Sequence, residues 1–483
     1  MHGLLNRNGV FRSDSIHDWR KVSMTTLAEA PTRSGSRVIA ALAGAVLVYS
    51  LMQTMLVPAL PVLGEHFDTS VAVTGWILTA YLLAAAVMAP IVGAMGDRFG
   101  DKRVLVIVLI IFALATFAAA AAPNIGVLLV VRAVQGVSMA SFPLAMAVLR
   151  RTVVGPELSS GIGWLAGTLG IGAGSALVIG GVILEYLSWQ WLFVITGILI
   201  VLALVAVVAV VPGSHRRPGM PTDWAGAGAL AFGLVSLLLA ITKASDWGVL
   251  SLGFWGLVVV AFVSFATLIA VDSRHDAPIV DMRVFRDKPM LITSALTLVF
   301  GFVPYIFYLC LPRILQAPET STYGSGFTVV QTGLALLPAA VLVFLGGRLT
   351  PALARRFGPR VPAVIALALM AAGAVGLAIW PSSVVAIVAF FSLVGLGNGV
   401  GFAVCALLVA SIVPPSEMAA ASGVNSVIRT VGSAVGAPVT TAVLAIGISD
   451  DSFALAFVMG AVISVVACLP AIALPATRTA QKA

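Results

Sequence analysis

Fourteen apolar stretches, each close in length to a membrane-spanning helix, constrain this 483-residue sequence more than any other feature. A helix needs about 20 residues to cross about 30 Å of hydrocarbon. Inside lipid the backbone must satisfy its own hydrogen bonds, so long apolar runs become helices. The sequence therefore predicts an all-α integral membrane protein with 14 transmembrane helices. The stretches are residues 38–61, 71–94, 104–122, 126–149, 160–184, 191–211, 224–242, 252–271, 290–311, 328–347, 361–380, 384–409, 419–446 and 453–475.

The composition excludes a water-soluble protein. The chain is 60% hydrophobic and 10% charged, and its mean hydropathy is +1.09. A soluble domain carries about 25% charged residues. A membrane barrel would show alternating segments of about ten residues, and the sequence has none.

The basic residues predict the orientation. With both termini in the cytoplasm, 23 of the 27 basic residues fall in cytoplasmic segments, and only Lys243 and Arg313 lie outside. Arg132 and Arg429 lie within spans. This asymmetry follows the positive-inside rule, and we expect a multi-pass protein of the plasma (inner) membrane surrounded by lipid. The net charge of +8 then follows from the membrane orientation and does not predict nucleic-acid binding.

The lengths of the loops divide the spans into a 6 + 2 + 6 pattern. Two six-helix blocks on either side of a two-helix insert are typical of secondary transporters, whose binding site lies between the halves. No glycine precedes any lysine, so the chain has no Gly-Lys-Ser/Thr phosphate loop and no ATP-driven motor is expected. The predicted units are an N-terminal tail (1–37), a six-helix bundle (38–211), a linker with spans 7 and 8 (212–289), a second bundle (290–475) and a C-terminal tail (476–483).

Glycines four residues apart recur in several spans and predict close helix contacts, because small residues let backbones approach in lipid. These pairs are Gly163/Gly167, Gly170/Gly174, Gly395/Gly399, Gly397/Gly401 and Gly432/Gly436.

The loop after the second span carries a specific motif. A glycine, an Asp-Arg pair, a second glycine and basic residues follow one another at Gly93, Asp97, Arg98, Gly100, Lys102 and Arg103. This resembles the signature loop of the major facilitator superfamily, which implies that superfamily's fold. The resemblance implies a latch for the state closed to the cytoplasm, with Asp97 held against the positive end of a helix. The alternative is a solvated charged turn that only sets topology.

The fourth span contains Arg132, Gln135 and Gly136, which resemble the Arg-x-x-Gln-Gly motif of the same superfamily. An arginine within a span is costly, so it faces protein or water and has a partner. Two readings stay open for Arg132: a charge that lines the pathway or assists proton movement, or a structural arginine paired with backbone carbonyls and Gln135.

Further motifs resemble the fourteen-span drug:proton antiporters across residues 38–475. They are Trp189-Gln-Trp-Leu-Phe193, Thr54 with Ala59-Leu-Pro61, Leu311-Pro312 with Gln316, and Asn425 with Arg429. The resemblance implies a secondary transporter that exports hydrophobic drugs or secondary metabolites in exchange for protons, without a cofactor or metal. Neither an enzyme nor a sensor is favoured, because no catalytic motif suits that alternative.

Three features depart from that family's pattern. Met52 stands where the family has an acidic residue and Val57 where it has asparagine, and a Gly-Pro pair is replaced by Ala176-Leu177. The spans contain no acid or histidine, although proton coupling needs a group that titrates in the pathway. Glu185, at the end of the fifth span, is the first candidate for that role, and the competing interpretation is an interfacial carboxylate that only ends the helix. The alternative is an uncoupled facilitator or exchanger of the same fold.

The predicted substrate route is apolar with a few polar groups, which suits a lipophilic small molecule. Besides Arg132 and Arg429, the candidate lining residues are Gln53, Thr54, Trp76, Tyr81, Tyr305, Tyr308, Asn398 and Asn425. For each of them, plain packing is the competing interpretation.

Overall fold

The computed structural model describes residues 35–154, 156–213, 223–248, 250–272, 287–321, 323–413, 418–444 and 450–474. The C-terminal tail, nearly all of the N-terminal tail, and residues 214–222, 249 and 273–286 of the predicted linker lie outside these residues. Within the described ranges, 14 helices are long and apolar enough to cross a membrane, which confirms the predicted fold class.

The helices follow one another along the chain with short connections. Several begin at a side-chain cap, and Thr328 and Gln331 form a reciprocal capping box. The elements are α2 (Gly35–Thr54), α3 (Leu60–His66), α4 (Val71–Phe99), α5 (Asp101–Ala120), α6 (Ile125–Gln135), the 3₁₀-helix η1 (Gly136–Ala140), α7 (Ser141–Thr152), α8 (Pro156–Tyr186), α9 (Gln190–Val210), α10 (Trp224–Trp247), α11 (Leu252–Asp272), α12 (Lys288–Gln316), α13 (Val329–Phe357), α14 (Arg360–Ile379), α15 (Val384–Ile412), α16 (Met418–Leu444) and α17 (Asp450–Ile472).

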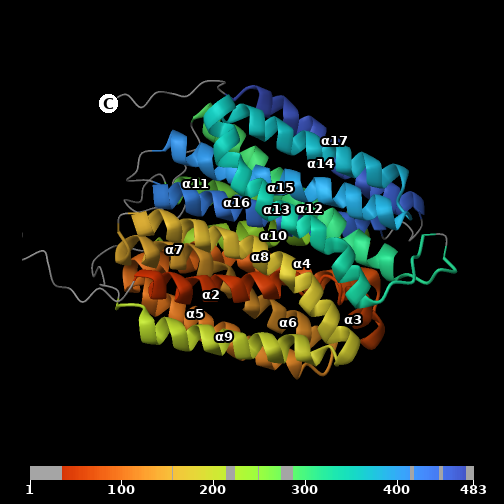
Figure 1. Ribbon diagram of the computed structural model, residues 1–483, viewed down its shortest axis with the longest axis horizontal. Coiled ribbons are helices and arrows are strands. Elements are labelled where there is room, and N and C mark those ends of the chain that lie inside the picture. Colours follow the sequence, from red (N-terminus) through yellow and green to blue (C-terminus); the bar gives the residue numbers. More distant parts are fainter. Residues whose placement is uncertain are drawn as a thin grey trace, which may run out of the picture.

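The long helices lie side by side in two groups (Figure 1). Helices α2 to α9 pack on one another and form what we call the N-terminal bundle, and α12 to α17 form the C-terminal bundle. The two bundles touch along two seams, where α8 lies against α13 and α4 lies against α16. Besides these seams, Gln53 of α2 contacts Tyr305 of α12 across the two bundles.

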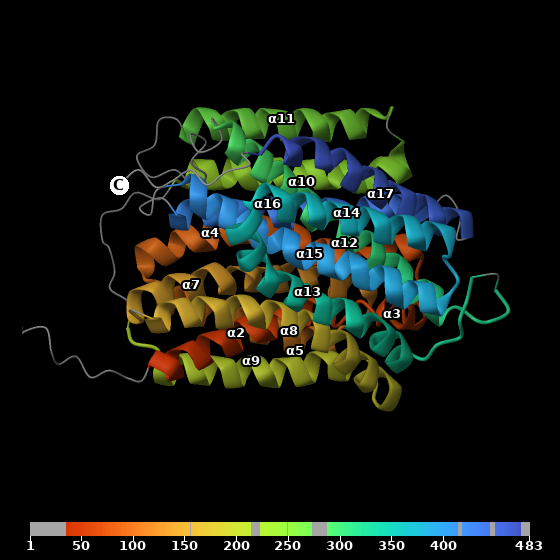
Figure 2. The same ribbon diagram turned by 45° about the horizontal axis from the view of Figure 1, so that its top comes forward.

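Helices α10 and α11 form a hairpin beside one seam (Figure 2). Leu230 and Leu234 of α10 pack with Val87 of α4 and Val424 of α16, so α10 contacts both bundles. Helix α11 lies at the outer edge, with 11% of its span buried against 72% for α12. Its exposed apolar side chains are suited to lipid.

Two predicted spans are interrupted, which corrects their assignment as single helices. In the first, α2 ends at Thr54, and a turn over residues 55–59 precedes α3. Pro58 has no N–H to donate and its ring clashes with the preceding turn, which breaks the helix. The fourth span is α6, η1 and α7 in series, and the tighter 3₁₀ turn lies just before Pro143.

The predicted glycine contacts are found at most of the described positions. A Cβ on Gly395 would lie 2.3 Å from the Ala339 carbonyl oxygen, and one on Gly432 would lie 2.2 Å from that of Leu298. These glycines therefore let α15 approach α13 and α16 approach α12. Gly163 is the exception, because a Cβ there would meet no atom within 4 Å.

The bundles meet most closely at one end of the molecule, here called the α3 end. A Cβ on Gly75 would lie 2.8 Å from Thr441 Oγ1, and one on Gly181 would lie 2.9 Å from Val330 Cα. Farther along the same seam the contact is looser, because a Cβ on Gly167 of α8 would lie 3.4 Å from the nearest atom, Phe344 Cε2 of α13. The structure therefore describes a conformation that is closed at the α3 end.

Candidate functional site

Arg132 is fully buried in the last turn of α6. Its Nε donates to the Ile77 carbonyl of α4 at 3.1 Å, and its Nη1 donates to Gln135 Oε1 at 2.7 Å. The guanidinium carbon lies 4.5 Å from the centre of the Tyr81 ring. Nη2 has no hydrogen-bond partner among the described residues. The arginine is therefore anchored in the N-terminal bundle, while both N–H groups of Nη2 lack a partner among the described residues.

The residues around Arg132 explain why its motif has this spacing. Gln135, three residues on and on the same helix face, donates from Nε2 to Thr116 Oγ1 of α5 at 2.9 Å. A Cβ on Gly136 would lie 2.7 Å from the Tyr81 carbonyl oxygen. Glycine at this position therefore lets α4 come close enough for the bond from Arg132 to Ile77.

Polar side chains join the two bundles next to Arg132. Gln53 Nε2 of α2 donates to the Tyr305 hydroxyl of α12 at 3.1 Å. Tyr305 meets Tyr308 edge to face, with ring centres 5.6 Å apart. The Arg132 guanidinium is within electrostatic range of the Tyr305 hydroxyl. Arg132 therefore lies at the face that the N-terminal bundle turns towards its counterpart.

Arg429 holds the corresponding place in the C-terminal bundle. It is half-buried in α16, and its guanidinium carbon lies 5.3 Å from the centre of the Phe402 ring. It is within electrostatic range of the Tyr49 hydroxyl of α2. The Tyr49 hydroxyl is in turn within electrostatic range of the Tyr305 hydroxyl of α12. Tyr49 was not predicted, although it lies one helical turn before Gln53 and on the same face.

The remaining lining candidates are less closely connected to this centre. Thr54 Oγ1 donates to the Ala173 carbonyl at 3.0 Å and fastens α2 to α8. Asn425 accepts a 2.6 Å bond from Thr297 within the C-terminal bundle. Asn398 is buried with its Oδ1 unpartnered, and Trp76 is half-buried on α4. No described contact links these four to the tyrosines or to either arginine.

Carboxylates are confined to the ends of the span-forming helices that the structure describes, where each stands in a first or last turn. Glu185 is the second-last residue of α8 and is exposed. Met52, at the position of the family's acidic residue, is fully buried and apolar. The centre formed by the tyrosines and the two arginines therefore contains no acid among the described residues.

The signature loop bends sharply at Gly100, whose φ of 95° favours glycine. Lys102 Nζ donates to the carbonyls of Val208 and Val211 at the C-terminal end of α9. That helix end carries a partial negative charge. Arg98 lies over the Phe99 ring, and Arg103 is exposed. The side chain of Asp97 lies outside the described residues, so its part in a latch stays a prediction.

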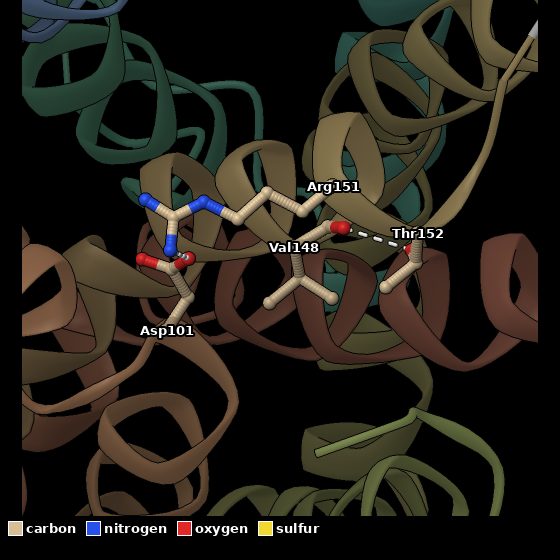
Figure 3. A network of polar contacts seen from close by, with 4 residues as sticks. All are labelled: Asp101, Val148, Arg151 and Thr152. Atoms are coloured by element: carbon tan, nitrogen blue, oxygen red, sulfur yellow. Dashed lines mark hydrogen bonds and ion pairs between the residues drawn. The ribbon is translucent and has the colours of Figure 1, made fainter. Parts of the chain in front are cut away.

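The loop also holds an ion pair that was not predicted (Figure 3). Asp101 begins α5, and its Oδ2 lies 2.6 Å from Arg151 Nη1 at the end of α7. The Asp101 side chain is 2% exposed and that of Arg151 is 36% exposed. Gly96 makes room for the carboxylate, because a Cβ there would lie 3.0 Å from Asp101 Oδ1. The pair joins two helices of the N-terminal bundle.

We expect Arg151→Gln to destabilise the protein by about 1–3 kcal/mol, because it removes the charge that faces a buried carboxylate. The double variant Asp101→Asn/Arg151→Gln should recover part of this loss. Arg150→Gln, at the exposed neighbour, should change stability by no more than about 0.5 kcal/mol. Thermal unfolding in detergent measures all three, and equal effects of the Arg150 and Arg151 variants would contradict the role of the pair.

A furrow of about 330 Å³ between α12 and α17 is lined by apolar residues such as Leu296 and Val466. Its lining contains none of the polar residues described above. Because Val466 is 57% exposed, the furrow faces lipid. Arg132 itself is buried, whereas Gln53, Tyr308 and Arg429 of the same centre are partly exposed.

Sequence comparisons place the chain among known proteins. The pattern of the Major Facilitator Superfamily matches residues 42–437 and 290–483. The tetracenomycin C resistance and export protein of Streptomyces glaucescens is 27% identical over 416 residues, which cover 85% of this chain and 76% of that protein. The multidrug efflux pump LfrA of Mycolicibacterium smegmatis is 28% identical over 412 residues, 84% of this chain and 80% of that protein.

Solved structures share the fold at low identity. A POT family peptide transporter in an auto-inhibited form has a TM-score of 0.65 at 18% identity, with 92% of this chain and 99% of that chain covered. The nucleoside transporter NupG has a TM-score of 0.64 at 16% identity, with 90% and 99% covered. With the family match extending over most of the sequence, the chain belongs to the Major Facilitator Superfamily and is a multi-pass membrane transporter.

Proposed function

We propose that this transporter exports lipophilic small molecules, such as drugs or secondary metabolites, across the plasma membrane by alternating access. The observation that carries the proposal is the pair of bundles that touch along α8/α13 and α4/α16, with buried polar side chains between them. The names of two similar proteins, one for tetracenomycin C export and one for multidrug efflux, support export as the direction.

The units that move in this proposal are residues 38–211 and 290–475, joined by 212–289 with its hairpin. The distribution of basic residues supports cytoplasmic termini, which assigns the α3 end to the outside. The described conformation is then closed outwards. Opening requires the contact between Gln53 and Tyr305 to break, which exposes the tyrosines and arginines to the substrate.

Different observations support two ways in which transport could be driven. The resemblance to drug:proton antiporters implies proton exchange, with Glu185 as the first candidate and Arg132 assisting. An uncoupled facilitator or exchanger is favoured by the lack of an acid in the described interior. Since a proton-coupled carrier needs a group that titrates in its pathway, the geometry supports the second form better.

We therefore expect dye efflux from proteoliposomes to continue without a pH gradient. Imposing a gradient, or replacing the exposed Glu185 by glutamine, should change the rate by no more than about twofold. Arg132→Ala should lower the rate with and without the gradient, because it removes the anchored cation of the centre. The rate is measured with whichever of fluorescein and rhodamine 123 the protein carries, and strict dependence on the gradient that is lost in Glu185→Gln would instead establish proton exchange.

A further inference from the structure

The contact region between the two bundles holds two arginines for which the described residues supply no counter-charge. Arg132 belongs to the N-terminal bundle and Arg429 to the C-terminal bundle. No carboxylate or imidazole accompanies them among the described residues, since the acids of the described spans stand in terminal turns and His66 lies on α3. Unbalanced charge in a low-dielectric interior is costly. A ligand of opposite charge would relieve that cost.

The donors around the arginines are also arranged for an anion. Arg132 is fully buried, yet Nη2 lacks a partner among the described residues. The Tyr305 hydroxyl accepts its bond from Gln53, so its own proton remains available to donate. Arg132 and Arg429 lie within electrostatic range of the Tyr305 and Tyr49 hydroxyls, respectively. Guanidinium and hydroxyl donors from both bundles thus face one region.

Apolar and aromatic side chains surround these donors. Tyr308 lies edge to face with Tyr305 and with Phe391. Phe402 covers the Arg429 guanidinium, and Met52 is fully buried in α2. A pocket of this kind holds a mostly apolar body and uses a few polar groups to fix its orientation.

We propose that the central site takes a lipophilic organic anion, whose carboxylate, phenolate or sulfonate lies between Arg132 and Arg429. The inference rests on the proposed export function and specifies its substrate class. Each bundle supplies one arginine, so a bound anion connects the two bundles. A lipophilic cation would instead face two like charges, with no carboxylate among the described residues of the centre to neutralise it.

The charge of the substrate also supplies a driving force. An anion that leaves a negative-inside compartment moves down the electrical gradient, which at 100 mV corresponds to roughly a fifty-fold concentration ratio per charge. The carrier then needs no proton-binding side chain of its own. This accounts for export through an interior in which the described residues include two arginines and no acid.

The test compares two dyes of similar shape and opposite charge, the anion fluorescein and the cation rhodamine 123. Each is loaded into proteoliposomes that contain the full chain, and a negative-inside potential is imposed with a potassium gradient and valinomycin. We expect the protein to carry fluorescein outwards, faster with the potential than without it, and to move rhodamine 123 little beyond protein-free vesicles.

Variants test the assigned residues. Arg132→Gln and Arg429→Gln should each slow fluorescein efflux by roughly tenfold or more, the effect of losing one charge-assisted hydrogen bond. Arg132→Lys and Arg429→Lys keep the charge and should retain more of the rate, which a purely structural role would not require. Arg150→Gln, at an exposed site, is the matched control and should behave as the unmodified protein.

The outcomes separate the inference from the function on which it rests. Faster movement of rhodamine 123 than of fluorescein, or fluorescein efflux that is unaffected by both glutamine variants, would overturn the anion site and leave export standing. Movement of neither dye by well-folded protein would contradict both.

Discussion

Replacing Gly333 by leucine is expected to abolish most transport while each bundle stays folded. Gly333 lies on α13 where it meets α8, and a Cβ there would be 2.4 Å from the Leu177 carbonyl oxygen. Any side chain therefore forces the two helices apart. Overpacking of this kind costs about 1–3 kcal/mol, which shifts the population away from the conformation closed at the α3 end by roughly 5- to 150-fold. A carrier that cannot close at one end cannot complete its cycle.

Gly163→Leu is the matched control. It places the same side chain on α8, at a glycine whose Cβ would meet no atom within 4 Å. We expect dye efflux within about twofold of the unmodified protein. Dye efflux from proteoliposomes and thermal unfolding in detergent separate lost transport from lost folding. Unimpaired efflux by Gly333→Leu would show that the α8/α13 seam need not close.

The spans were predictable because lipid leaves few alternatives. Each apolar run must hide its backbone in a helix, and length alone then fixes the number of crossings. The interruptions were not predicted from hydropathy, because Pro58 and Gly136 lie within stretches that are apolar throughout. What breaks the helix is the missing N–H of proline. Gly136 has no Cβ, which lets α4 pack closely against the fourth span.

In the candidate site, the sequence could predict contacts only between residues on the same helix. Arg132 and Gln135 share a face at a spacing of three residues, and their hydrogen bond was part of one of the two interpretations that the motif left open. Gln53 and Tyr305 are 252 residues apart, and their contact depends on how the bundles pack. The ion pair between Asp101 and Arg151 depends in the same way on the packing of α5 and α7.

A disulfide across the second seam tests whether the bundles must separate. The ideal Cβ position on Gly75 of α4 is 3.7 Å from Thr441 Cβ of α16. Disulfides join residues whose Cβ atoms are about 3.5–4.5 Å apart, so Gly75→Cys/Thr441→Cys should cross-link on oxidation. The bond would hold the bundles together at the α3 end. Each single cysteine variant, which retains the native Cys310, Cys405 and Cys468, is a control that should transport after oxidation.

The most direct measurement follows dye efflux by this double variant before oxidation, after oxidation and after reduction, in the same proteoliposomes. Counting maleimide-reactive thiols gives the extent of cross-linking at each stage. Alternating access predicts that efflux stops as the thiols disappear and returns when the reductant restores them. Efflux at the full rate from completely cross-linked protein would contradict a carrier whose two bundles part at the α3 end.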